Sequence, residues 1–265
     1  MLEQWLAPMK QALQRAGLAA YGMLARTGVM KRAWARRAFL VTYSVYKAWI
    51  EAGPVDRLKE FVAPGSKVVD IGANVGFFTL KFADWTGESG CVIAVEPDHE
   101  NFETLAAKIE AAGLQRRVRL VRAAAATEGG TIGLERNELH PGDHRIRLGS
   151  GGITVPAVTI DDLVADAGAP RVSLVKIDVQ GAELLVIKGA KHTLEKMRPA
   201  LFIEVDDHAL GCFGSSARAL VAHLEEAGYE MYQLANEGAQ PKLSKDGLFE
   251  NLRTRSYIDV LFLPK

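Results

Sequence analysis

Asp70, Gly72 and Gly76 occur within one short segment, Val68–Thr79, whose residue types suit ligand binding. Glycine has no side chain, so Gly72 and Gly76 let the backbone approach a ligand closely. A helix that begins after such a loop presents free amide donors at its N-terminus. We therefore expect a cofactor site built from the residues of this loop and first helical turn: Asp70, Gly72, Ala73, Asn74, Gly76, Phe77, Phe78 and Thr79.

The glycine spacing of this loop argues against a dinucleotide. The dinucleotide fingerprint would need glycines at positions 72, 74 and 77, and this chain has Asn74 and Phe77 at the last two. Asp70 would also repel a diphosphate, whereas it suits a ligand with a cationic centre. An NAD-dependent oxidoreductase is therefore a less favoured alternative.

A second acid follows at the predicted end of the next strand, where Glu96 precedes Pro97. A carboxylate at this place can accept hydrogen bonds from both hydroxyls of a ribose. Ribose recognition combined with a preference for positive charge indicates S-adenosyl-L-methionine. The alternative interpretations are a helix N-cap for Asp70 and a solvated turn acid for Glu96.

Three residues are candidates for proton transfer during catalysis: Asp178, Glu204 and His144. Asp178 and Glu204 end two predicted strands of a parallel sheet, whose carboxyl ends meet at one ligand-binding edge. Asp178 is the first choice, as a general base or a cofactor contact; its alternative role is a helix cap. His144 lies in a polar loop that could cover the cofactor, or that could simply be a solvated turn.

A divalent metal ion, Mg²⁺ or Mn²⁺, is a less favoured addition to this site. Asp178, Glu204 and Asp206 could supply oxygen ligands, and Asp207 and His208 follow directly. Their spacing matches no fixed metal-binding motif. Glu183, in the first turn of a predicted helix, is assigned a structural role.

Alternating strands and helices must position these residues. The sequence predicts strands at Lys67–Ile71, Cys91–Val95, Val118–Ala123, Ser173–Ile177 and Leu201–Val205, with helices at Phe77–Thr86, His99–Ala112, Ala182–Met197 and Ser215–Ala227. Such alternation predicts an α/β, doubly wound, mostly parallel seven-stranded sheet. We expect a β-hairpin insert after the third strand, and a C-terminal antiparallel hairpin (Tyr229–Leu234 and Ser256–Leu263) joined by a loop without a helix.

The N-terminal segment differs from the rest of the chain in charge. Residues 1–50 contain eight basic groups and one acid, a net +7, so the remainder carries −7 because the whole chain is neutral. We predict a basic, aromatic helical segment over residues 1–54 and a catalytic domain over 55–265. The segment could be a cap, a lid over the substrate, or a contact for anionic lipid headgroups at a membrane surface.

Composition sets wider limits. The two cysteines are too few for a disulfide framework, and no apolar run reaches the length of a membrane-spanning helix, so we expect a cytoplasmic chain. The balanced charge gives no sign of a nucleic-acid partner. The oligomeric state stays open, and a homodimer is compatible with the sequence.

Four segments together resemble the FkbM family of S-adenosylmethionine-dependent methyltransferases. They begin at Asp70, Glu96, Val155 and Lys176, and the resemblance covers about Ser66–Leu234. It implies a Rossmann-like class I methyltransferase fold and, usually, O-methylation of sugars or natural-product hydroxyls. By this resemblance the cofactor site includes Asp70, Gly72, Asn74, Gly76 and Glu96.

The expected function is therefore transfer of a methyl group from S-adenosyl-L-methionine to a hydroxyl of a small molecule, a sugar or glycosylated metabolite. N-methylation of a small-molecule amine is one alternative, because an amine nucleophile needs less help from a base. A non-catalytic S-adenosylmethionine-binding protein is another.

Overall fold

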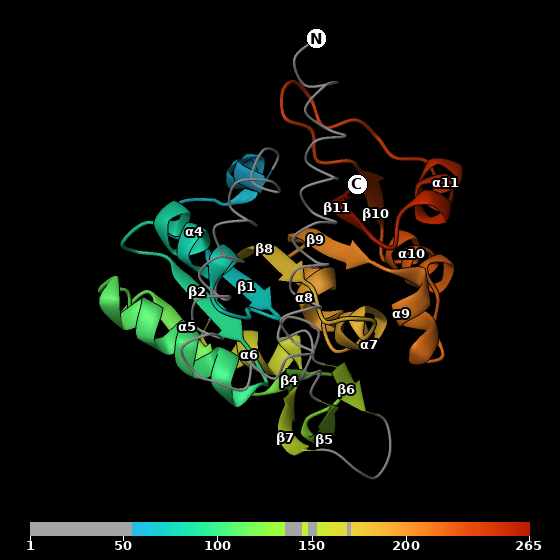
Figure 1. Ribbon diagram of the computed structural model, residues 1–265. Coiled ribbons are helices and arrows are strands. Elements are labelled where there is room, and N and C mark those ends of the chain that lie inside the picture. The colour runs from blue at the N-terminus through green and yellow to red at the C-terminus, as the bar shows by residue number, and fades with distance from the viewer. Residues whose placement is uncertain (1–54, 136–144, 148–152, 169–170) are drawn as a thin grey trace, which may run out of the picture. The chain divides into compact units, whose positions relative to one another are not determined.

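The computed structural model describes residues 55–135, 145–147, 153–168 and 171–265 (Figure 1). Its main sheet consists of β1 (Lys67–Ile71), β2 (Cys91–Val95), β3 (Val118–Val121), β8 (Val172–Ile177), β9 (Ala200–Val205), β10 (Tyr229–Tyr232) and β11 (Ile258–Pro264). The helices are η3 (Asp56–Phe61), α4 (Phe77–Thr86), α5 (His99–Ala111), α6 (Ile160–Asp166), α7 (Glu183–Lys188), α8 (Lys191–Lys196), α9 (Asp207–Cys212), α10 (Ala217–Glu226) and α11 (Lys245–Thr254).

The seven strands of the main sheet lie in the order β10-β11-β9-β8-β1-β2-β3. The pairs from β9 to β3 are parallel, and β11 runs antiparallel to both β9 and β10. This confirms the predicted doubly wound sheet and the class I methyltransferase arrangement that the family resemblance implies. The strand order reverses beside β1, where ligands bind in open α/β sheets.

Alternating side chains of the strands pack on opposite faces of the sheet. Val69 and Ile71 of β1 join the larger apolar cluster, which includes residues of α6 to α11. Val68 joins the other cluster, together with residues of η3, α4 and α5. Asp70, between Val69 and Ile71, therefore shares the α4 face with Val68.

The insert after β3 is larger than the predicted hairpin. It contains β4 (Ala124–Ala125), β5 (Gly130–Glu135), β6 (Arg145–Arg147) and β7 (Ile153–Val158), which form a second sheet in the order β4-β7-β5-β6. β5 pairs antiparallel with β6 and β7, and β7 also pairs in parallel with β4. The predicted hairpin lacked the short strands β4 and β6. β4 follows β3 closely and pairs with β7, so it connects the insert to the main sheet.

Two helical expectations were wrong in detail. The single helix expected over Ala182–Met197 is two helices, α7 and α8, separated at Gly189. A Cβ atom on Gly189 would lie 2.2 Å from the carbonyl oxygen of Ala126, so this turn packs against the backbone of the insert region. The segment between β10 and β11 contains a helix, α11, whose buried Leu248 packs on the larger cluster, instead of the helix-free loop we expected.

No helix in the described ranges is both long and apolar enough to cross a membrane. The predictions for residues 1–54, and for the loop that carries His144, lie outside the described residues.

Candidate functional site

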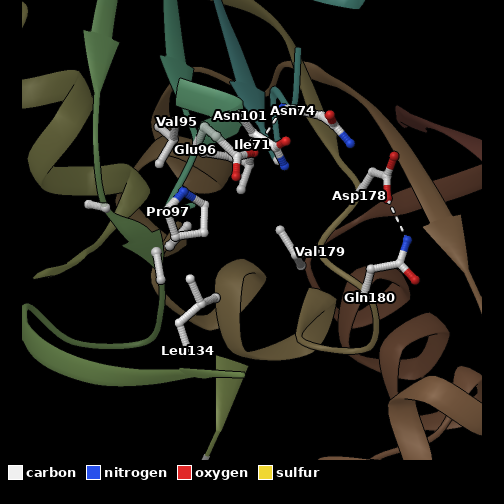
Figure 2. A pocket seen from close by; sticks show the side chains of 14 residues that line it. Ile71, Asn74, Val95, Glu96, Pro97, Asn101, Leu134, Asp178, Val179 and Gln180 are labelled. Carbon is white, nitrogen blue, oxygen red and sulfur yellow. Dashed lines mark hydrogen bonds between the residues drawn. The ribbon is translucent and has the colours of Figure 1, made fainter. Parts of the chain in front are cut away.

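A pocket opens at the carboxyl ends of β1, β2 and β8. The pocket is open to solvent, and the cavity volume within it is about 50 Å³. Figure 2 shows Glu96 and Pro97 on one side of this pocket and Asp178 and Gln180 on another. Its lining consists of Ile71, Gly72, Asn74, Val95, Glu96, Pro97, Asn101, Ala123, Ala124, Ala125, Leu134, Asp178, Val179 and Gln180.

The loop after β1 is held tightly against the neighbouring strands. The amides of Gly72 and Ala73 both donate to the carbonyl oxygen of Val95, at 3.0 Å. Gly72 has a φ of +74°, and a Cβ atom there would lie 1.9 Å from the carbonyl oxygen of Asp178. Only glycine fits this position, so the close approach of the two chain segments explains the glycine that the sequence shows.

The loop leads into helix α4, which begins at Phe77. Its N-cap residue, Gly76, has a φ of +89° and provides no side-chain hydrogen bond. Asn74 also has a positive φ, of 50°, a conformation that asparagine tolerates better than most residues. Three residues of this loop, Gly72, Asn74 and Gly76, thus have a positive φ.

Glu96 lies in the pocket wall with its carboxylate anchored by two backbone amides. Asn74 donates to one oxygen at 2.8 Å, and Asp98 donates to the other at 2.9 Å. Burial raises the pKa of Glu96 to about 7, although both amide donors oppose this rise. Each carboxylate oxygen can accept more than one hydrogen bond, so the anchored group can still receive ribose hydroxyls.

Asp70 is fully buried and does not line the pocket. The hydroxyl of Thr79 donates to one of its oxygens at 2.6 Å, and the ammonium of Lys176 lies 3.5 Å from the other. The expected attraction between Asp70 and a cationic ligand is therefore reduced by an opposite charge close to it. The structure thus places Asp70 behind the loop and outside the pocket lining, beside Thr79 and Lys176.

Asp178 follows β8 and lines the pocket. Its backbone amide donates to the carbonyl oxygen of Ile71 at 3.1 Å. Its carboxylate accepts from the side-chain amide of Gln180 at 3.2 Å, the hydrogen bond drawn between these two residues in Figure 2. The same amide nitrogen of Gln180 donates to Glu204 at 3.1 Å. One side-chain amide thus connects the two acids that we predicted as candidates for the base, and Glu204 itself lies outside the pocket lining.

The side chain of Glu183 folds back onto the segment that carries Asp178 and Gln180 and accepts hydrogen bonds from its backbone. One of its carboxylate oxygens accepts from the amides of Val179 and Gly181, at 3.2 and 3.0 Å. Burial raises the pKa of Glu183 to about 7, with a further contribution from Asp178. Glu183 therefore lies in a first helical turn as predicted, and it also fixes the loop before that helix.

The residues predicted for the cofactor site divide into two groups. Five line the pocket: Gly72, Asn74, Glu96, Pro97 and Asp178. Five others lie outside the lining, in the loop or in α4: Ala73, Gly76, Phe77, Phe78 and Thr79. Phe78 lies beside Lys176, whose ammonium is 5.2 Å from the centre of the ring.

The predicted metal ligands have other partners. Asp206 caps α9 by accepting from Ala209 at 2.9 Å, and Asp207 accepts from Ala217 at 2.7 Å. The described part of the chain contains no group of three His, Cys, Asp or Glu side chains arranged to hold a metal ion.

Much of the apolar wall of the pocket was not predicted from the sequence. Ala123, Ala124 and Ala125 follow β3, and Leu134 comes from β5 of the insert. The run of alanines carries no chemical signal, although its position after the third strand of the sheet indicates the ligand-binding edge. Asn101, near the start of α5, was also missed.

Comparisons with known proteins identify relatives of this chain. Hexuronic acid methyltransferase AglP of Haloferax volcanii is 28% identical over 141 residues, which are 53% of this chain and 55% of that protein. The chain thus spans about half the length of this curated relative.

Solved structures with a similar chain course include methyltransferase FkbM from Methylobacillus flagellatus KT. It has a TM-score of 0.47 and 17% identity, over 94% of this chain and 59% of that one. A SAM-dependent O-methyltransferase from Thermotoga maritima has a TM-score of 0.44 and 12% identity, over 79% and 63%.

A family match covers the whole lining of the pocket. The model of the methyltransferase FkbM domain matches residues 70–231, which include the glycine loop, Glu96, the insert and Asp178. Because this match extends over more than half of the 265 residues, the chain belongs to the FkbM methyltransferase family.

Proposed function

We propose that this chain transfers a methyl group from S-adenosyl-L-methionine to a hydroxyl of a small molecule, a sugar or glycosylated metabolite. Membership of a methyltransferase family supports methyl transfer, and a relative that is a hexuronic acid methyltransferase supports a sugar-like acceptor. The observation that carries the proposal is the pocket that joins the glycine loop, Glu96 and Asp178 at one edge of the sheet.

The residues of the pocket fit S-adenosyl-L-methionine. Glu96 presents an anchored carboxylate where a ribose needs hydrogen-bond acceptors, and its two backbone donors hold it in place. Ala123, Ala124, Ala125 and Leu134 provide an apolar wall suited to a flat base. S-adenosyl-L-methionine would supply a methyl group on a cationic sulfur, which is already a good leaving group.

The protein's main task is then to align the acceptor and to accept a proton. Asp178 is the candidate for the base because it lines the pocket, while Glu204 is reached only through Gln180. The acceptor oxygen would bond to the methyl carbon as the carbon–sulfur bond breaks, and its proton would pass to Asp178. Alignment and proton transfer together account for the expected rate enhancement.

The first test is the cofactor. Calorimetry should show micromolar binding of S-adenosyl-L-methionine and no comparable binding of NAD. The opposite result would identify a nicotinamide enzyme and overturn the proposal. Incubation with sugars, uronic acids and amines, followed by mass detection of the products, separates O-methylation from N-methylation. Cofactor binding without any product would favour a non-catalytic binding protein.

The second test is the base. Asp178→Ala should lower kcat by about 100-fold or more and leave cofactor binding nearly unchanged, because general-base catalysis is typically worth this much. Glu204→Ala and His144→Ala are the matched comparisons. If Asp178→Ala kept its activity and one of these lost it, the base would be assigned to that residue. Chelator treatment, which should not reduce the rate, tests the metal alternative.

A further inference from the structure

Lys176 is a buried cation in the middle of the sheet, where a lysine is unexpected. Only 3% of the residue is exposed. It lies in β8 directly opposite Asp70 of β1, and both side chains are on the face covered by α4. Burying an ammonium is costly unless it is paired and hydrogen-bonded, so its contacts account for its presence there.

Those contacts reach two different parts of the site. The ammonium donates to the carbonyl oxygen of Gly72, at 2.8 Å, and to that of Ile71, at 3.4 Å. It also lies 3.5 Å from a carboxylate oxygen of Asp178 and 3.5 Å from one of Asp70. One group thus contacts the loop assigned to the cofactor and the acid assigned to the acceptor.

We propose that Lys176 is a positioning residue for methyl transfer, which fixes the Gly72 loop and the Asp178 carboxylate relative to each other. This inference rests on the proposed function of the same pocket. β1 and β8 bring the two parts side by side, and Gln180 donates to one carboxylate oxygen of Asp178 while the Lys176 ammonium lies near the other. The same ammonium holds the Gly72 carbonyl, so it connects the orientation of the carboxylate to the position of the loop.

A purely structural alternative is that Lys176 only compensates the charge of Asp70. Lys176→Met alone cannot separate the two roles, because it leaves Asp70 buried without its cation and would impair folding. Asp70→Asn removes that charge. The informative comparison is therefore Asp70→Asn with and without Lys176→Met, since neither protein buries an uncompensated Asp70.

The expected result is a double variant that folds as stably as Asp70→Asn but turns over about 100-fold more slowly, because small errors in alignment cost this much. KM for the acceptor should change much less than kcat. Lys67→Met is the control: Lys67 is a strand lysine in β1 that donates to the backbone carbonyl of Ala167, at the opposite end of the strands. It should leave kcat unchanged.

Amide hydrogen exchange provides a measurement that needs no substrate. The double variant should exchange faster than Asp70→Asn in residues 70–80 and 176–184, and Lys67→Met should not. Equal exchange and equal kcat in the double variant and Asp70→Asn would overturn the proposal. If the wild type showed no methyl transfer, the proposed function would fail, and hydrogen exchange would still decide whether Lys176 positions the two segments.

Lys176→Arg covers the case in which the double variant does not fold. Asp70 would keep a cationic partner, but a larger planar group would replace the compact ammonium. We expect a folded protein with kcat reduced and cofactor binding weakened. Wild-type kinetic constants in this variant would contradict a positioning role.

Discussion

Two buried glutamates next to the pocket make the stability of the protein sensitive to pH. Burial raises the pKa values of Glu96 and Glu183 from 4.5 to about 7. Between these values the folded chain holds more protons than the unfolded chain. The folded state is therefore stabilised by proton binding to these two glutamates. This contribution is complete below about pH 4.5 and is lost as the pH rises through 7. Each glutamate could account for about 3 kcal/mol at most.

Glu183→Gln should reduce this pH dependence. Glutamine keeps the carbonyl oxygen that accepts from Val179 and Gly181, and it removes the buried charge. The free energy of unfolding, measured with urea between pH 5 and 8, should fall less in Glu183→Gln than in the wild type. Glu226→Gln, at an exposed position of α10, is the control. An unchanged slope in Glu183→Gln would contradict the raised pKa.

At the scale of elements, the junction between β1 and α4 depends on close contact with β8. Gly72 has a positive φ, and any side chain there would collide with the backbone of Asp178. A clash with backbone cannot be relieved by moving a flexible side chain. The loop and the segment after β8 must therefore shift together if this contact is disturbed.

Gly72→Ala should destabilise the protein and abolish cofactor binding. Gly113→Ala is the matched control, because Gly113 also has a positive φ, of 68°, but has open space around its Cβ position. The control should cost about 1 to 2 kcal/mol from backbone strain alone. Thermal unfolding and calorimetry measure both effects. Similar losses in the two variants would show that the contact with Asp178 is unimportant.

The insert sheet contributes to the pocket through Leu134 of β5. Leu134 is 2% exposed and lines the pocket. Ile153, the residue of β7 that pairs with Leu134, is 49% exposed. Leu134→Ala should cost about 2 to 5 kcal/mol and weaken cofactor binding. Ile153→Ala should stay within about 0.5 kcal/mol of the wild type. Unchanged binding in Leu134→Ala would remove the insert from the proposed site.

Helices and strands whose ends depend on neighbouring residues in the sequence were predicted more accurately than those that depend on distant contacts. The bounds of β1, β2 and α4 agree with the expected ranges because apolar runs, turn residues and Gly87 mark their ends. The break at Gly189 depends on contact with Ala126, which is distant in sequence, so helical periodicity did not reveal it. Helix α11 was hidden in a polar segment with little apolar content.

The same contrast applies to the site. Gly72, Glu96 and Asp178 were predicted because their types and positions at strand ends indicate chemistry. A buried strand lysine such as Lys176 is expected to pair with an acid, and it does. Which acids these are, and the bridge made by Gln180, were not predicted, because both arise only when β1, β8 and β9 lie side by side. Pairing of β1 with β8 also places Asp70, which we expected at the ligand, beside Lys176 and outside the pocket lining.

At the scale of the whole molecule, the charges are divided along the chain. Residues 1–50 carry +7 and residues 51–265 carry −7. A cap or a lid, two of the three roles that we consider for the basic segment, would contribute electrostatically to stability or activity. Residues 55–265 contain two extensive apolar clusters of their own, so this part should fold without the segment.

Removal of residues 1–54 should therefore give a folded protein with a lower unfolding temperature and reduced methyl transfer. The difference in unfolding temperature should narrow at high salt, because salt screens attraction between exposed charges. Calorimetry and activity measurements at low and high ionic strength test this expectation. Equal stability and activity with and without the segment would contradict both the cap and the lid interpretations.

The place of β11 in the sheet has a consequence for biosynthesis. β11 follows both β9 and β10 in the sequence, yet it lies between them in the sheet and pairs with both. Until residues 258–264 leave the ribosome, the edge of β9 that pairs with β11 has no partner strand. The apolar side chains that pack against Val260 and Phe262 are then exposed to solvent. Exposed strand edges favour aggregation. A chain that ends before Ile258 would therefore be a substrate for chaperones and proteases, although every residue of its pocket had already been made.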